Sequence, residues 1–178
     1  GLVTTATITH ATPAGFTAQV AKRAEESEIA SQYLDIGIDV LLGGGSKFFD
    51  AAQRPDLRDM AGDFARAGYQ VVNDAAGLRA ASTTGRLLGT FDAEHLPFSL
   101  DRKSDPAIAA RVPTLAEMAQ VALDRLSARP EGFVLQIEGG RVDHAAHSND
   151  IGGLVYDQLA FDDAVGVAIQ FAAGRDDT

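Results

Sequence analysis

The chain has 178 residues, of which 46% are hydrophobic and 22% charged, a composition that suits one globular domain with a packed core. Fifteen basic residues against twenty-five acidic ones leave a formal charge of −10. This balance argues against a nucleic-acid backbone or an anionic membrane surface as the main partner, although metal ions or a local cationic pocket would still admit an anionic substrate. There is no cysteine, so a zinc site must use His, Asp and Glu, which is typical of catalytic zinc sites.

The first half of the chain alternates strands with helices. β-branched residues predict a strand over 2–9, and Thr12-Pro13 favours a helix start with the threonine hydroxyl as N-cap. We expect this helix to continue into the charged run KRAEESE, because apolar residues recur at nearly helical spacing: Phe16, Val20 and Ala24. The elements expected next are a helix over about 27–35, a strand over 38–46, a helix over 56–67 and strands over 69–74 and 85–91.

The second half begins with a polar stretch, 101–113, which we expect to be an exposed or mobile loop. Pro113-Thr114 then opens an amphipathic helix over 114–128, and GFVLQIE, 132–138, reads as a strand. A final helix is expected over 154–173, with these residues facing inward: Leu154, Phe161, Val165, Ala168 and Ile169. Strands that alternate with helices imply an α/β fold with a parallel sheet covered on both faces. No segment approaches the ~20 apolar residues that a membrane-spanning helix needs.

The stretch QIEGGRVDHAAHSND, 136–150, combines carboxylates and imidazoles at the end of an apparent buried strand. Asp143 and His147 are four residues apart, so on a helix both side chains can approach one cation, and an oxygen–imidazole pair suits Zn²⁺. Glu138 stands before two glycines, where it could reach a harder ion such as Mg²⁺. The alternative is a surface loop whose polar residues cap the next helix. Ligands of parallel sheets bind beyond the strands' carboxyl ends, which favours the metal interpretation.

Other polar residues have competing interpretations. Thr12 suits an N-cap, but its hydroxyl can also ligate a metal, and Arg23 is either a solvated charge or a fork for phosphate. The GGG before Ser46-Lys47 lacks the spacing of a phosphate loop, so it predicts a tight turn after a strand. His95 has no partner nearby in sequence and is expected to face solvent. The sequence contains no Gly-x-Ser-x-Gly motif, so it does not point to a nucleophilic serine.

Four segments together resemble bacterial and animal alkaline phosphatases: GLVTTATITHATPAGFTAQVAKR, DVLLGGGSKFF, VPTLAEM and GFVLQIEGGRVDHAAHSND. The resemblance covers nearly the whole chain and is weakest over about 50–110. It implies a three-layer α/β/α sandwich with a mostly parallel sheet. It further implies hydrolysis of phosphate monoesters at alkaline pH with two Zn²⁺ and one Mg²⁺. A serine would attack phosphorus, and a zinc-activated water would hydrolyse the phosphoserine.

The resemblance also implies roles for individual residues. Asp143 and His147 match ligands of the zinc that binds the leaving group. Glu138 and Thr12 match ligands of the magnesium. Arg23 matches the arginine that holds the phosphoryl oxygens.

Two further positions vary within the family. His10 stands where some bacterial members have an aspartate near the magnesium, and His144 where some have a lysine. Histidines at these positions are expected to alter the surroundings of the metals, and hence metal preference and pH optimum.

By the same resemblance, residues 1–178 are a single, incomplete alkaline phosphatase-like domain. The nucleophile and the aspartate shared by zinc and magnesium would precede the chain, and the remaining zinc ligands would follow it. We therefore expect little activity from the chain alone. A periplasmic or secreted homodimer, with phosphate esters and inorganic phosphate as ligands, is implied for the complete protein. Two alternatives are another metal-dependent phosphate or sulfate ester hydrolase of this architecture and a non-catalytic metal-binding module.

Overall fold

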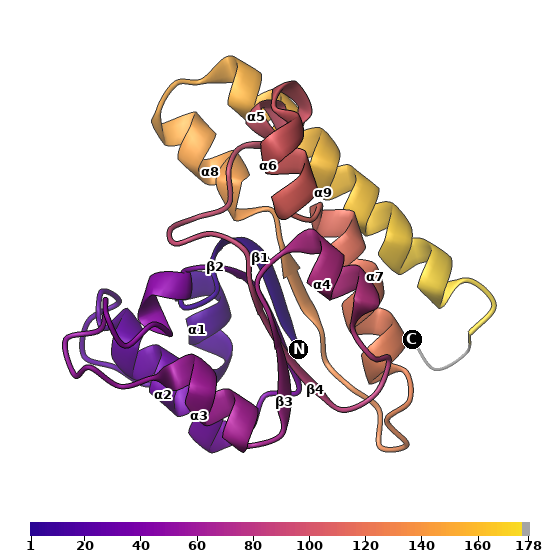
Figure 1. Ribbon diagram of the computed structural model, residues 1–178. Helices are drawn as coiled ribbons and strands as arrows, with labels where there is room; N and C mark the ends of the chain where they lie inside the picture. The colour runs from indigo at the N-terminus through magenta and orange to yellow at the C-terminus, as the bar shows by residue number, and fades with distance from the viewer. Residues whose placement is uncertain (176–178) are drawn as a thin grey trace.

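The computed structural model describes residues 1–175 and contains a five-stranded sheet with the order β3-β4-β2-β1-β5 (Figure 1). All neighbouring strands are parallel. The strands are β1 (Leu2–Thr7), β2 (Val40–Gly44), β3 (Tyr69–Val72), β4 (Arg86–Thr90) and β5 (Gln136–Glu138). Because every strand runs the same way, the loops after their carboxyl ends meet at one edge of the sheet.

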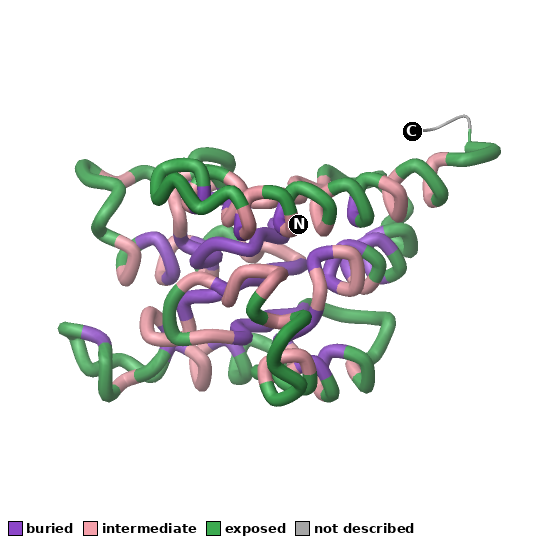
Figure 2. The backbone as a smooth tube through the Cα atoms, turned by 90° about the horizontal axis from the view of Figure 1, so that it is seen from above, coloured by how far each residue is buried: buried purple, intermediate pink, exposed green. Residues whose placement is uncertain are grey.

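Helices cover both faces of this sheet, so the molecule has three layers, with the buried strands between them (Figure 1, Figure 2). One face carries α1 (Ala11–Thr17), α2 (Glu26–Ile36) and α3 (Met60–Arg66), and a short 3-10 helix, η1 (Ser46–Phe48), follows β2. The opposite side carries α4 (Ala75–Ala80), α5 (Ser99–Ser104), α6 (Pro106–Arg111), α7 (Leu115–Leu126), α8 (Gly140–His147) and α9 (Ile151–Ala172). The expected three-layer α/β/α sandwich is confirmed. Among residues 1–175, no helix is long and apolar enough to cross a membrane.

The protein has two hydrophobic cores, one on each face of the sheet, because successive strand residues point to opposite faces. In β2, Leu41 packs into the core under α2 and α3, while Leu42 packs into the core under α7. In β4, Leu88 packs into the core under α2 and α3, and Leu87 packs into the core under α7. Both faces therefore need apolar residues, which explains why the strands read as continuous apolar runs rather than alternating ones.

The connections after two neighbouring strands leave the sheet on opposite faces. β1 leads into α1 on one face, whereas β5, its hydrogen-bonded neighbour, leads into α8 and α9 on the other (Figure 1). In parallel sheets, ligands bind beyond the carboxyl ends of neighbouring strands whose connections diverge in this way. We call the space beyond the ends of β1 and β5 the β1–β5 crevice.

Three sequence expectations about the first helix were wrong. α1 ends at Thr17, and Arg23 lies in an irregular segment instead of on a helix. His10, not Thr12, occupies the N-cap position, and no side chain caps the helix. The chain leaves the helix because Gln32 of α2 holds Gln19 through both its backbone N–H and its carbonyl, an interaction that an uninterrupted helix could not make.

The expectation of a loop over 101–113 was also wrong, because this stretch contributes to α5 and α6. α5 is held at its start by Asp157 of α9, whose buried carboxylate accepts hydrogen bonds from the backbone N–H and hydroxyl of Ser99. α6 begins with Asp105 as N-cap and Pro106 in the first turn. The tether to Asp157 joins residues far apart in sequence, and for this reason the local pattern did not reveal it.

The last two elements differ from expectation in their details. β5 has three residues, so most of GFVLQIE is irregular. α9 starts earlier than expected, at Ile151, because Asp150 caps it through the backbone N–H of Gly153. Of the residues expected to face inward, Ile169 is 64% exposed and Val165 is 37% exposed, so these two assignments were wrong.

α7 begins where Pro113-Thr114 predicted, and its capping box gives a stability prediction. The Thr114 hydroxyl accepts from the backbone N–H of Glu117, whose carboxylate accepts from the backbone N–H of Thr114. Thr114→Ala is expected to lower the free energy of unfolding by about 1 kcal/mol, measured by urea denaturation. Thr114→Ser is the control because it keeps the hydroxyl. Equal losses in the two variants would contradict a capping role.

Candidate active site

The β1–β5 crevice is built on a contact between its two strands. Thr4 and Glu138 are paired in the sheet register, and the Thr4 hydroxyl donates a hydrogen bond of 2.6 Å to Oε2 of Glu138. Next to them, the hydroxyl of Thr5 accepts from the backbone N–H of Arg141 at 3.0 Å. These threonines fix the turn from β5 into α8, and Glu138 is held half-buried at the crevice floor.

α8 carries the Asp–His pair that its spacing predicted. Oδ1 of Asp143 lies 3.4 Å from Nε2 of His147, and the two side chains are 70% and 80% exposed. One oxygen and one imidazole nitrogen on successive turns are chemically suited to one side of a zinc ion. Within residues 1–175, however, no group of three or more His, Asp or Glu side chains is placed to hold a metal ion. The donors present therefore fit part of a metal site.

Arg23 reaches the crevice from the irregular segment after α1. Its Nη2 lies 2.8 Å from Nε2 of His10, the residue that starts α1. An arginine can only donate, so Nε2 of His10 accepts this hydrogen bond. Thr12 is exposed on the first turn of α1. The structure thus brings Arg23 to His10, although the helix expected to carry the arginine ends before it.

Three histidines from distant parts of the chain form a cluster at the crevice: His10, His95 and His144. The ring centroids of His95 and His144 are 4.4 Å apart, and that of His10 lies 5.6 Å and 5.5 Å from them, with nearly perpendicular ring planes. His95, expected to face solvent, is instead half-buried, and its Nδ1 accepts from the backbone N–H of Thr7 at 3.0 Å. This residue was missed because it follows β4, and only the sheet brings it to β1.

Arg141 also lies at this cluster, and no pattern in the sequence predicted it there. Its guanidinium stacks on the ring of Phe98, 3.7 Å from the centroid, and its Nη1 lies 3.1 Å from Nδ1 of His144. The cluster is therefore flanked by two arginines, Arg23 and Arg141. Burial lowers the pKa of His144, and Arg141 and His10 act in the same direction. Asp143 and Glu138 act in the opposite direction, so charges of both signs surround the ring of His144.

His95 gives a prediction about acid stability. Burial lowers its pKa from 6.5 to about 4, and His144 and Arg141 also lower it. Between these two pH values the unfolded chain binds more protons than the folded one, so the free energy of unfolding is expected to fall as the pH drops from about 6.5 to about 4. His95→Asn should flatten this dependence, measured by urea denaturation at pH values across that window. An unchanged slope would contradict the prediction.

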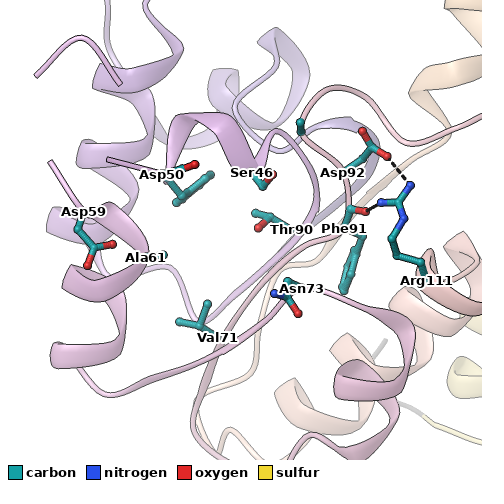
Figure 3. A pocket seen from close by; sticks show the side chains of 12 residues that line it. Ser46, Asp50, Asp59, Ala61, Val71, Asn73, Thr90, Phe91, Asp92 and Arg111 are labelled. Carbon is teal, nitrogen blue, oxygen red and sulfur yellow. Dashed lines mark hydrogen bonds and ion pairs between the residues drawn. The ribbon is translucent and has the colours of Figure 1, made fainter. Parts of the chain in front are cut away.

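A separate open cavity of about 400 Å³ lies at the same sheet edge, beyond β3 and β4 (Figure 3). Arg111 borders it and donates to the carbonyl of Phe91 at 2.6 Å and to Asp92 at 2.9 Å. The carboxylates of Asp50 and Asp59 accept hydrogen bonds from the backbone of their own turns. Arg111, Asp50 and Asp59 therefore stabilise local structure at this cavity.

The fold is that of an α/β/α sandwich, and an arginine–histidine pair and part of a set of metal donors lie beyond the ends of β1 and β5. The chain belongs to the alkaline phosphatase family, whose sequence description, "Alkaline phosphatase", matches residues 1–178. It is 38% identical to alkaline phosphatase 3 of Bacillus subtilis, over 97% of this chain and 36% of that protein. It therefore spans about a third of the length of this relative.

Solved structures agree with this assignment. The crystal structure of Thermus thermophilus alkaline phosphatase is similar with a TM-score of 0.91 and 46% identity, over 97% of this chain and 36% of that one. A variant alkaline phosphatase from the Antarctic bacterium TAB5, whose structure has Mg bound, is similar with a TM-score of 0.79 and 26% identity, over 97% and 47% of the two chains.

Proposed function

We propose that residues 1–178 act, within a longer alkaline phosphatase domain, in the metal-dependent hydrolysis of phosphate monoesters at alkaline pH. The observation that supports the proposal is that the Arg23–His10 pair, the Glu138 carboxylate and the Asp143–His147 pair lie at or after the carboxyl ends of two neighbouring strands, β1 and β5. The crevice lies where ligands of parallel sheets bind. The nucleophilic serine, which would form a phosphoserine, would come from a part of the domain outside residues 1–178.

We assign each residue the role that membership of the family implies for it. Arg23 would bind the phosphoryl oxygens through its planar fork, and His10 would hold the guanidinium in place. Asp143 and His147 would ligate Zn²⁺, and Glu138 and Thr12 would ligate Mg²⁺. Bound metal ions would stabilise the charge of the entering and leaving oxygens. Thr4 would orient Glu138 through its hydrogen bond, and His144 and His10 would shape the surroundings of the metals.

The wider context is part of the proposal. The complete protein would be a periplasmic or secreted homodimer that binds phosphate esters and inorganic phosphate, and no nucleic-acid binding is expected of a chain with a formal charge of −10. A second candidate, a sulfate ester hydrolase, is less well supported, because the family that matches the chain is that of the alkaline phosphatases.

The test uses both the chain and a chimera in which residues 1–178 replace the matching 36% of the Thermus thermophilus enzyme. Hydrolysis of p-nitrophenyl phosphate and of p-nitrophenyl sulfate is measured with added Zn²⁺ and Mg²⁺ and again after chelation. We expect the chimera to hydrolyse the phosphate ester and the chain alone to be almost inactive. An inactive but folded, metal-loaded chimera would overturn the proposal, and so would a preference for the sulfate ester.

A further inference from the structure

We propose that His95 is a positioning residue for phosphate binding, because its ring holds the imidazole of His10 in the orientation that receives Arg23. This inference rests on the proposed function. It adds a residue from the loop after β4 to the groups at the β1–β5 crevice. His95 acts through His10 and does not itself touch the substrate.

The loop that carries His95 is fixed at several points to the ends of neighbouring strands. The carbonyls of Asp92 and Glu94 accept from the backbone N–H groups of Ser46 and Gly45, at 2.9 Å and 2.8 Å. On the other side of His95, the backbone N–H of Leu96 donates to the carbonyl of Thr5 at 3.0 Å. The loop therefore has the rigidity that a positioning residue needs.

The ring of His95 is itself oriented by a hydrogen bond. Its Nδ1 accepts from the backbone N–H of Thr7, so it carries no proton, and the ring plane is fixed relative to the end of β1. The centroid of the ring then lies 4.4 Å from that of His144 and 5.6 Å from that of His10, whose ring plane is nearly perpendicular. The oriented ring of His95 thus packs against one side of the His10 ring.

The orientation of the His10 ring depends on this packing because the hydrogen bonding of His10 is incomplete. Its Nε2 accepts from Arg23, but its Nδ1 is buried and has no hydrogen-bond partner. One hydrogen bond alone leaves an imidazole free to turn about its side-chain bonds. Packing against His95 and His144, at nearly perpendicular ring planes, is what defines the orientation.

Arg23 in turn depends on His10. It is exposed, it lies in an irregular segment, and within residues 1–175 its side-chain hydrogen-bond partner is His10. An arginine held in advance binds phosphate more tightly than one that must be ordered on binding. Loss of the His95 ring should therefore weaken phosphate binding and leave the chemical step nearly unchanged.

The first measurement uses the chain itself, in which proton–nitrogen NMR correlations report the state of the His10 ring. His95→Asn keeps an acceptor for Thr7 but removes the ring, whereas His95→Phe keeps a ring but removes the acceptor. We expect His95→Asn to shift and broaden the His10 signals and His95→Phe to retain most of the native pattern. Glu94→Gln is the control, because this neighbouring side chain binds Lys47 instead of the histidines. Native His10 signals in a folded His95→Asn chain would overturn the proposal.

The second measurement uses the chimera and separates binding from catalysis. We expect His95→Asn to raise KM and the inhibition constant of inorganic phosphate by about 10-fold, the size of effect that residues supporting a site produce, with kcat changed less than about twofold. His95→Phe should recover most of the affinity. A loss confined to kcat, or no loss in a folded variant, would overturn the inference. If the unmodified chimera were inactive, the proposed function would fail, and the NMR result would still decide the role of His95.

Discussion

Asp143→Ala in the chimera is expected to lower kcat/KM for p-nitrophenyl phosphate by at least about 100-fold, because a lost ligand should cost more than the 10–100-fold that a lost supporting residue costs. The carboxylate is 70% exposed on α8 and points toward His147, so its removal should leave the fold intact. Bound zinc, measured by elemental analysis, should fall together with activity. Asp163→Ala, which removes an exposed carboxylate from α9, is the matched control and should change neither quantity.

The double variant Asp143→Ala/His147→Ala tests whether these two residues act as one unit. Residues that hold the same ion show non-additive effects, so the double variant should be little worse than Asp143→Ala alone. If the loss of kcat/KM in the double variant equalled the product of the losses in the two single variants, the two residues would have independent roles. Full zinc content and full activity in Asp143→Ala would contradict the assignment of this pair as zinc ligands.

The sequence predicted those parts of the fold and site that depend on local patterns. α7 combines a capping sequence with a continuous apolar face, and both signals lie within one stretch of chain. Asp143 and His147 are four residues apart, so any helix in this segment brings them together. The family resemblance then implied roles for residues such as Arg23, whose position could not be derived from spacing, and these roles remain predictions.

The errors concern residues whose position depends on distant contacts. α1 ends early because Gln32 holds Gln19, and α5 forms where Asp157 holds Ser99. His95 looked like a solvent-facing residue because its contact with the backbone N–H of Thr7 spans 88 positions. Periodicity and capping signals describe a short window of chain, so they contain no information about such pairs.

Gly44→Ala is expected to destabilise the fold strongly, because the loop that carries His95 crosses β2 at this glycine. A Cβ at this position would collide with the backbone carbonyl oxygen of Glu94, and it would lie 3.2 Å from the carbonyl oxygen of Ala6. Both obstacles are backbone atoms, so no side-chain rotation can relieve the overlap. We expect the free energy of unfolding to fall by about 3 kcal/mol, the upper end of the range for overpacked sites.

The same substitution elsewhere in the chain should have the opposite sign, which makes the comparison informative. Gly166 lies inside α9, and an added Cβ would have no atom within 4 Å apart from its chain neighbours and the helix's own backbone, so Gly166→Ala should raise the free energy of unfolding by about 0.5–1 kcal/mol. Urea denaturation of both variants measures the difference. Because Glu94 directly precedes His95, Gly44→Ala should also disturb the His10 signals, whereas Gly166→Ala should not. A stable Gly44→Ala chain would mean that the loop does not cross β2 this closely, and the anchoring of His95 to β1 would then lose its structural basis.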